Sequence, residues 1–262
     1  MILDDIKIKR IEQLDRDKEK TPFSEIKKAA EAVSTPCKDF KNAITPQNEK
    51  EIAVIAEVKK ASPSKGIIQP NFKPAETAVL YEKAGARAIS CLTEEYYFKG
   101  SAEYLKEIKQ RVTIPVLRKD FIFDQYQIYE ARAIGADAIL LIAAMLDINE
   151  LREYRKIAED LGLSVLAESH NEEELYKVLE AGCTITGINN RNLKTFEVSL
   201  ETTKKLAKLI PDNCTIVTES GIASNSDIRT LKASGAKAAL IGETLMKSGD
   251  IAKTLCELTD LT

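Results

Sequence analysis

The sequence is poor in the residues that build metal sites and disulfide frameworks. It contains one histidine, His170, and five widely scattered cysteines with no Cys-x-x-Cys pair. Zinc sites need clustered histidine and cysteine ligands, and disulfide frameworks need a paired set of cysteines. We therefore predict no metal site, and we interpret His170 as a loop residue rather than a catalyst. An odd number of dispersed thiols favours a reducing compartment, the cytoplasm.

Long hydrophobic runs, a strong net charge and cofactor motifs are also missing. No apolar run is long enough to span a bilayer, and the first residues lack the basic and apolar regions of a signal peptide. The formal net charge of −3 gives no electrostatic reason to expect nucleic acid or an anionic membrane as a partner. No Gly-x-Gly-x-x-Gly turn follows the first apolar run. We therefore expect cofactor-free chemistry.

From residue 52 onward, strand and helix signals alternate. A chain of 262 residues with 44% hydrophobic and 30% charged residues fits a globular protein that is one α/β barrel or two smaller domains. Several helix-like stretches end in glycine, as helix C-caps do. The apolar runs are Val54–Val58, Ala88–Leu92, Pro115–Leu117, Ala138–Ile142, Ser164–Ala167, Ile185–Ile188, Thr215–Val217 and Ala238–Ile241. Eight such alternations predict an α/β fold, a (β/α)8 TIM barrel, over residues 52–262. The missing dinucleotide turn argues against a doubly wound sheet.

Residues 1–48 precede the first strand and predict an N-terminal helical extension of this single domain. Ile6, Ile8, Ile11 and Leu14 are spaced for one apolar stripe. Thr21-Pro22 is typical of an N-cap followed by proline at the first helical position, opening a helix to about residue 33. The extension must pack on the barrel. Whether it only stabilises the fold or also covers a site stays open.

Charged residues recur where the strands end, which is where (β/α)8 barrels build their active sites. Glu57 and Lys59 lie two residues apart on the first strand, so they point the same way, and burying both is costly unless they serve a purpose. Six strand ends carrying carboxylates or lysines favour an enzyme over a set of solvated loops. The polar strand-end residues are Glu57, Lys59, Thr93-Glu94-Glu95, Arg118-Lys119-Asp120, Glu168, Asn189-Asn190-Arg191, Glu219-Ser220-Gly221 and Gly242-Glu243.

Two chemical roles follow from this pattern. Gly221 and Gly242 adjoin helix starts after the seventh and eighth strands, where backbone N–H groups form the recurrent phosphate site of barrels. Arg191 and Ser62 would complete that site, although tight turns alone also explain the glycines. Separately, Lys59 and Lys119 would converge with Glu57 and Glu168. Burial or a second ammonium would lower a lysine pKa from about 10.4 toward a range useful for proton transfer. Acidic strand ends can hold Mg²⁺, but these lysines already neutralise them.

Seven motifs stand in order along the chain. They are I-A-E-V-K-K-A-S-P-S-K-G (55–66), L-T-E-E-Y-Y-F-K-G-S (92–101), P-V-L-R-K-D-F-I-F-D-Q-Y-Q-I (115–128), G-A-D-A-I-L-L-I (135–142), G-I-N-N-R-N-L (187–193), T-E-S-G-I (218–222) and L-I-G-E-T-L-M (240–246). Together they resemble the indole-3-glycerol phosphate synthase family of tryptophan biosynthesis. The resemblance covers essentially the whole chain, including the extension. It implies ring-closing decarboxylation and dehydration of 1-(2-carboxyphenylamino)-1-deoxyribulose 5-phosphate to indole-3-glycerol phosphate, CO2 and water, without a cofactor.

The resemblance also implies roles for single residues. Lys119 corresponds to a general acid, Lys59 to the lysine that meets the substrate carboxylate, Glu57 and Glu168 to acid/base carboxylates, and Asn189 and Glu219 to polar pocket residues. The phosphate would lie on Ser62, Arg191, Ser220, Gly221, Gly242 and Glu243, and the anthranilate ring on Phe98, Phe121 and Leu140. Some family members have serine where Glu243 stands, so phosphate contact there would come from the backbone N–H.

Two rival interpretations are weighed against this one. Another phosphate-binding barrel enzyme, phosphoribosylanthranilate isomerase, would need a cysteine and an aspartate as its acid/base pair, whereas Cys91 lies inside a strand run. A barrel that binds a phosphorylated ligand without converting it would be expected to lack the catalytic lysines or glutamates. We expect a phosphorylated small molecule as the partner, and a monomer or weak homo-oligomer.

Overall fold

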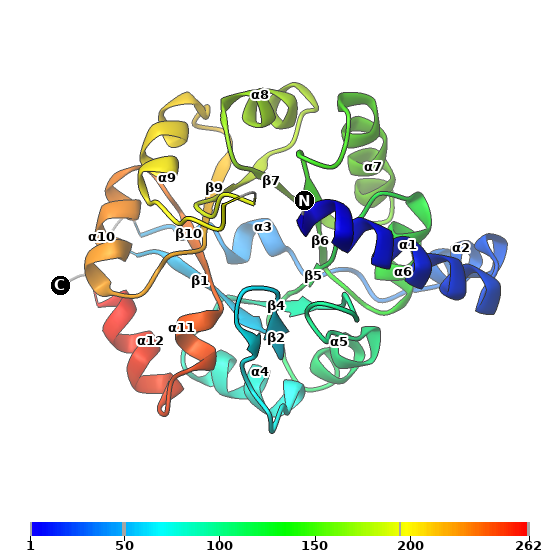
Figure 1. The fold of residues 1–262 in the computed structure, drawn as a ribbon, viewed down its shortest axis with the longest axis horizontal. Helices are drawn as coiled ribbons and strands as arrows, with labels where there is room; N and C mark the ends of the chain where they lie inside the picture. The colour runs from blue at the N-terminus through cyan, green and yellow to red at the C-terminus, as the bar shows by residue number, and fades with distance from the viewer. Residues whose placement is uncertain (1, 49–50, 194, 261–262) are drawn as a thin grey trace.

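A closed barrel forms the centre of the molecule (Figure 1). The computed structural model describes residues 2–48, 51–193 and 195–260. Within these ranges, eight parallel strands follow one another round the barrel in chain order, and β1 pairs with both β4 and β10. The strands are β1 (Ala53–Val58), β4 (Ala88–Leu92), β5 (Val116–Lys119), β6 (Ala138–Ile142), β7 (Ser164–Ser169), β8 (Ile185–Asn189), β9 (Thr215–Glu219) and β10 (Ala238–Ile241). The predicted (β/α)8 barrel is confirmed. The ranges predicted for extension and barrel include Met1, Lys194, Leu261 and Thr262, which lie outside the described residues.

Helices surround the barrel, and several begin at a side-chain cap. Asp124, Asp147 and Ser224, for example, accept backbone N–H groups of the first turns of α6, α7 and α10. The glycines predicted to end helices have φ between 81° and 100°, as C-caps require. The helices are α4 (Pro74–Lys83), α5 (Ala102–Lys109), α6 (Gln125–Ala133), α7 (Ile148–Asp160), α8 (Glu172–Glu180), α9 (Glu201–Leu206) with the 3-10 turn η1 (Ala207–Leu209), α10 (Asn225–Ala233), α11 (Glu243–Met246) and α12 (Ile251–Thr259). In the described ranges, no helix combines the length and apolar character needed to cross a membrane.

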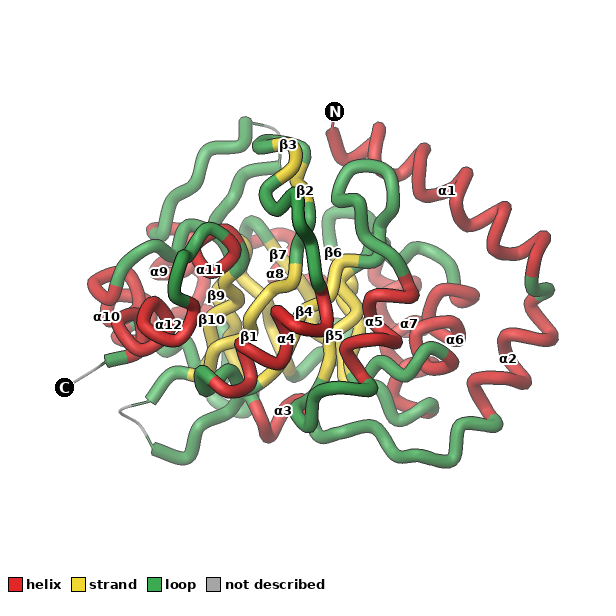
Figure 2. Tube along the Cα trace, turned by 90° about the horizontal axis from the view of Figure 1, so that it is seen from below, coloured by secondary structure: helices red, strands yellow, loops and turns green. Residues whose placement is uncertain are grey.

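The strands divide their side chains between two cores, as the period of two requires. Ile55, Leu117, Leu140 and Val217 fill the barrel interior, while alternate residues pack outward under the helices. The short helix α3 (Phe40–Ala43) closes the N-terminal end of the barrel, where Phe40 is fully buried (Figure 2). The helix thus closes this end of the barrel, and the charged strand-end residues lie at the opposite end.

Three strands run two residues further than the sequence predicted. β5 continues to Lys119, β7 to Ser169 and β9 to Glu219, because the ladder continues through pairs such as Leu92 with Lys119. Lys119, Glu168 and Glu219 thus stand on strands and not in loops. The loop after β1 carries a small hairpin of β2 (Ala61–Ser62) and β3 (Gly66–Ile67).

The N-terminal extension consists of α1 (Ile2–Lys20) and α2 (Phe23–Glu31), and α1 rises over the end of the barrel that carries β2 and β3 (Figure 2). The predicted apolar stripe is wrong in two positions, since Ile8 and Ile11 are 55% and 40% exposed. The buried face follows i, i+4 spacing instead and has Arg10 at its centre. Pro22 is the N-cap of α2 and not its first residue, because its carbonyl accepts the amide of Ile26 at 3.1 Å.

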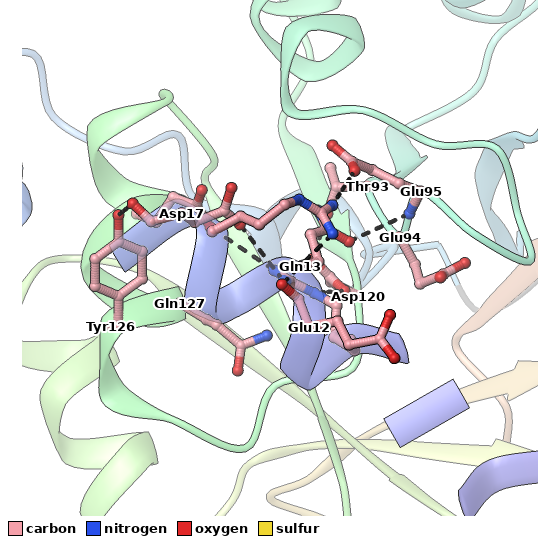
Figure 3. Close-up of polar contacts among 12 residues, drawn as sticks. Glu12, Gln13, Asp17, Thr93, Glu94, Glu95, Asp120, Tyr126 and Gln127 are labelled. Carbon is pink, nitrogen blue, oxygen red and sulfur yellow. Dashed lines mark hydrogen bonds and ion pairs between the residues drawn. The ribbon is translucent and has the colours of Figure 1, made fainter. Parts of the chain in front are cut away.

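A buried polar network joins α1 to the barrel (Figure 3). Arg10 donates to Asp120 at 3.0 Å, and both side chains are fully buried. Asp120 also accepts hydrogen bonds from Thr93 at 2.7 Å and Arg118 at 3.0 Å. Figure 3 shows Gln13 and Asp17 of α1 reaching the same region, and the Tyr126 hydroxyl donates to the Asp17 carbonyl at 3.0 Å. The extension is therefore fixed to the residue that directly follows Lys119.

Candidate active site

A cavity of about 460 Å³ opens at the C-terminal ends of the strands. Its floor is the apolar interior of the barrel, and its walls are the strand ends and the loops that follow them. Every residue assigned to the site from the sequence lines this cavity: Glu57, Lys59, Ser62, Phe98, Lys119, Phe121, Leu140, Glu168, Asn189, Arg191, Glu219, Ser220, Gly221, Gly242 and Glu243. The structure thus brings together the residues selected by the strand-end rule and those implied by the family resemblance, whatever the role of each member.

The first pair stands on β1 and the residue that follows it. Lys59 Nζ lies 2.5 Å from Glu57 Oε2, and Glu57 is only 5% exposed. Gly242, at the end of the neighbouring strand β10, makes room for this pair. A Cβ atom on Gly242 would collide with the Glu57 carboxylate and lie 3.1 Å from Lys59 Nζ. Gly242 therefore has a steric reason to be glycine besides the predicted phosphate contact.

The second cluster centres on Lys119 at the end of β5. Its ammonium lies 3.1 Å from Glu168 Oε2 on β7 and makes a short contact with Glu219 Oε2 on β9. Glu219 packs over the backbone of Gly187, where an added Cβ would lie 2.6 Å from Glu219 Oε1. Among the described residues, that oxygen has no hydrogen-bond partner. One ammonium thus serves two buried carboxylates.

These charges shift one another's pKa values. Burial opposes the charge on Lys119, but the carboxylates of Glu219, Glu168 and Glu57 outweigh it and raise the pKa of the lysine. Burial opposes the charge on Glu168 too, yet Lys119 and His170 hold the pKa of that carboxyl far below its usual range. For Glu219 burial dominates, and the pKa rises to about 7 although Lys119 opposes the shift. The expectation of a lowered lysine pKa is therefore wrong for Lys119, because carboxylates surround its ammonium.

His170 lies in the bend that follows β7, as predicted for a loop residue, but the contacts of its ring were not predicted. Its Nε2 lies 3.2 Å from Glu168 Oε1 and its Nδ1 lies 2.9 Å from Glu174 Oε2. The imidazole is thus held between two carboxylates, one of which belongs to the cavity. The sequence carried a signal for this arrangement, because His170 follows Glu168 by two residues, the same spacing that linked Lys59 to Glu57.

Apolar residues form another part of the cavity lining. The rings of Phe98 and Phe121 lie with their centroids 5.9 Å apart, and Leu140 of β6 is buried beside the cavity. The fourth strand of the barrel, β6, indeed contributes apolar residues here, as the sequence predicted. Glu94 holds the Phe98 loop in place, because its carboxylate accepts the backbone N–H groups of residues 96 to 98 at 2.7 to 2.8 Å.

The other end of the cavity collects turns, hydroxyls and cations. Ser220 and Gly221 follow β9 with φ of 67° and 79°, a left-handed turn that exposes successive backbone N–H groups. Gly242 is the N-cap of α11, whose first amides have no acceptor within the helix. The Glu243 carboxylate is turned to Lys247, 2.5 Å away, and this hydrogen bond lowers its pKa.

The cavity has lining residues that the sequence analysis did not find. Ile2, Leu3 and Ile6 of α1 contribute to it, as do Leu193, Phe196, Val198 and Lys247. The extension therefore covers part of the site as well as packing on the barrel. The sequence pattern does not predict this coverage, because an apolar residue on a helix face has the same pattern whether it packs in a core or lines a cavity. In the parts of the chain that the structure describes, no group of three or more His, Cys, Asp or Glu residues is placed to hold a metal ion.

Comparisons with known proteins agree with one another. A family model described as indole-3-glycerol phosphate synthase matches residues 3–258. The indole-3-glycerol phosphate synthase of Ruminiclostridium cellulolyticum is 49% identical over 98% of this chain and 98% of its own. That of Endomicrobium trichonymphae is 50% identical over 99% of this chain and 100% of its own. The structure of 3-hexulose-6-phosphate synthase from Salmonella typhimurium covers 80% of this chain and 98% of its own with a TM-score of 0.66, at 12% identity, a likeness of fold alone.

Proposed function

The chain belongs to the indole-3-glycerol phosphate synthase family, and from this premise we propose how its cavity performs the family's reaction. The activity is that of a carboxy-lyase in tryptophan biosynthesis, which closes an indole ring with loss of CO2 and water. The observation that carries the assignment of residues is the placement of Lys119 between Glu168 and Glu219, in a cavity that Phe98, Phe121 and Leu140 also line.

Ring closure is assigned to Lys119. In this step the aromatic carbon that bears the carboxylate attacks the ketone carbon of the sugar chain, and the ketone oxygen needs a proton. An ammonium fixed by two carboxylates in a buried site donates a hydrogen bond to that oxygen and stabilises its developing charge. Loss of CO2 then returns the bonding electrons to the ring. Phe98, Phe121 and Leu140 would hold the ring over the ketone carbon, which supports reaction through orientation.

Lys59 and the glutamates are assigned to the substrate carboxylate and to dehydration. Lys59 would meet the substrate carboxylate before CO2 leaves and then protonate the departing hydroxyl group. A carboxylate must remove the proton from the adjacent carbon, and Glu57 and Glu168 are the candidates because each lies beside a lysine. Asn189 and Glu219 complete the polar wall around Lys119 and Glu168.

The phosphate is assigned to the opposite end of the cavity. Ser62, Arg191, the backbone N–H groups of Ser220 and Gly221 and those at the start of α11 would bind it. The engagement of the Glu243 carboxylate by Lys247 supports contact through its backbone N–H and not its side chain.

The rival activities have less support. Cys91 belongs to the outer core between barrel and helices, so it does not supply the acid/base pair that phosphoribosylanthranilate isomerase would need. A barrel that only binds its ligand would not need to bury several carboxylates and lysines at a cost in stability. We further propose one domain of extension and barrel, a monomer or weak homo-oligomer, in the cytoplasm. The five free cysteines suit a reducing compartment.

Turnover of the substrate tests the assignment. The purified protein is incubated with 1-(2-carboxyphenylamino)-1-deoxyribulose 5-phosphate and indole fluorescence is followed. We expect product from the parent protein and a loss of kcat of about 10² to 10⁴ in Lys119→Ala. Lys106→Ala, a change at an exposed lysine of α5, is the control and should match the parent. Binding without product in the parent would favour the non-catalytic barrel, and full activity in Lys119→Ala would refute the role of Lys119.

A further inference from the structure

Both carboxylate oxygens of Glu168 are in contact with a nitrogen-bearing side chain. Its Oε2 faces Lys119 Nζ at 3.1 Å, inside the cavity, while its Oε1 faces His170 Nε2 at 3.2 Å, behind it. Each carboxylate oxygen thus lies close to a nitrogen that can carry positive charge, although the Nε2 contact lies at ion-pair distance without hydrogen-bond geometry. Glu219 shares Lys119 but has no second cation of this kind among the described residues.

His170 is itself held in a fixed position. Glu174, in the first turn of α8, places Oε2 2.9 Å from His170 Nδ1 and 2.8 Å from the His170 amide. The other oxygen of Glu174 accepts a hydrogen bond from the side chain of Asn171, the N-cap of the helix, at 2.7 Å. The start of α8 therefore aims the imidazole at Glu168.

We propose that His170, held by Glu174, is a positioning residue of the reaction, which keeps Glu168 ionised and pointed at Lys119 throughout the catalytic cycle. This inference rests on the proposed role of Glu168 in proton transfer. When Lys119 turns its proton toward the substrate, Glu168 loses part of its compensating charge. A fixed imidazolium behind it then prevents Glu168 from taking up the proton that Lys119 needs to deliver.

The surroundings of the imidazole support a charged ring. The groups that face it are Glu168 from β7 and Glu174 from α8, and beyond Glu168 lie Lys119, Asn189 and Glu219. Lys177 of α8 is turned away, because its ammonium donates to the carbonyls of Ala143 and Leu146. Burial works against the charge on His170, but its hydrogen bond with Glu174 and its close contact with Glu168 raise its pKa to about 10.

A role in capping α8 alone would not need this geometry. The Asn171 side chain already accepts the backbone amide of Glu174, and the Glu174 carboxylate already accepts the backbone amide of His170. Neither bond uses the imidazole. The ring is therefore available for a function that its backbone does not perform.

Two measurements test the proposal. Because the chain contains a single histidine, the ring signal of His170 is identified in a proton NMR titration of tag-free protein without further assignment. We expect the signal to stay that of an imidazolium up to about pH 9, and its pKa to fall by about one to three units in Glu174→Gln. Titration of the parent near the ordinary value of about 6.5 would overturn the proposal.

The second measurement is the pH dependence of kcat in His170→Gln, which keeps a hydrogen-bond donor but removes the charge. Without the cation, the pKa of the Glu168–Glu219 pair rises. As the pH is lowered, Glu168 therefore becomes protonated at a higher pH than in the parent, and the activity that needs it ionised is lost there. We expect the acid limb of kcat to move up by about one to three pH units with little change in KM. Glu173→Gln, which removes a charge from the same helix turn without touching His170, should keep the parent profile.

The outcomes separate this inference from the assignment of the active site. A lower melting temperature in His170→Gln with an unmoved acid limb would mean a structural role only, and would refute the positioning role. If Glu168→Gln retains full kcat, the proposed role of Glu168 fails. If Glu168→Gln loses kcat while His170→Gln keeps the parent profile, only the inference about His170 fails.

Discussion

Removing the Arg10 side chain tests how the extension is attached to the barrel. Arg10 and Asp120 are both fully buried, and Arg10 Nε lies 3.0 Å from Asp120 Oδ1. In Arg10→Met the apolar stem of the side chain is kept and the guanidinium is lost. Asp120 keeps Arg118 and Thr93 as partners, at 3.0 and 2.7 Å, so its charge is only partly uncompensated.

The size of the effect follows from this partial loss. Breaking a buried ion pair by removing one partner costs about 3–5 kcal/mol, and the remaining partners of Asp120 place this case near 3 kcal/mol. At roughly 2–4 °C per kcal/mol for a chain of this length, the melting temperature should fall by about 6–12 °C. Because Ile2, Leu3 and Ile6 of the same helix line the cavity, KM should rise as α1 loosens.

Thermal unfolding and steady-state kinetics measure both effects. Arg16→Met is the matched control, since Arg16 lies on the same helix and its ion pair with Glu95 is exposed, so a change within about 0.5 kcal/mol is expected. Burial opposes the charge on Asp120, but Arg10 and Arg118 lower its pKa from 3.8 to about 2. The stability that this pair adds is present above 3.8 and is lost as the pH falls toward 2. The gap between parent and Arg10→Met should therefore narrow in acid. A loss below 1 kcal/mol at neutral pH, or a gap independent of pH, would refute the reasoning.

Three further changes test the cavity itself. Gly187→Ala should displace Glu219 and lower kcat by about tenfold or more. Gly249→Ala, where an added Cβ meets no other atom, is the control and should leave kcat unchanged. An unchanged kcat in Gly187→Ala would contradict the close packing of Glu219 on Gly187. Because burial raises the pKa of Glu219 above its ordinary value, to about 7, the folded state holds a proton that the unfolded chain releases earlier. Stability should therefore fall as the pH rises from about 4.5 to about 7, and the melting temperature of Glu219→Gln should lack this dependence on pH. An equal dependence in the variant would mean that another group causes it. Phe98→Leu should raise KM about tenfold through loss of an aromatic contact, whereas exposed Tyr176→Leu should leave it unchanged; equal KM values would remove Phe98 from the ring site.

The sequence predicted the fold and the membership of the cavity because both depend on regular geometry. Eight alternations of strand and helix leave few architectures, and the strand-end rule then selects the residues that meet. It also predicted the shared direction of Glu57 and Lys59 from the period of a strand. These inferences need no knowledge of which side chains touch.

Other features depend on contacts that no local pattern contains. The face of α1 was misread because a buried arginine interrupts it, and only Asp120, 110 residues away, explains why Arg10 is buried. The sequence analysis assigned Gly242 to the phosphate site and gave Gly187 no role. In the structure, each of them makes room for a carboxylate on a neighbouring strand. The pKa of Lys119 was expected to fall because burial was considered without the carboxylates around it.

The distribution of the cations among the buried carboxylates determines which carboxyl has its pKa raised. Glu57 has Lys59 to itself, and Glu168 has both Lys119 and His170. Glu219 is left with a share in Lys119 and one oxygen that has no hydrogen-bond partner within the described residues. Glu219 is therefore the carboxylate with the least support against the cost of burial, and burial raises its pKa to about 7. The composition of the strand ends gives the number of charges. Only their pairing in space determines that the pKa of Glu219 is raised while that of Glu168 is lowered.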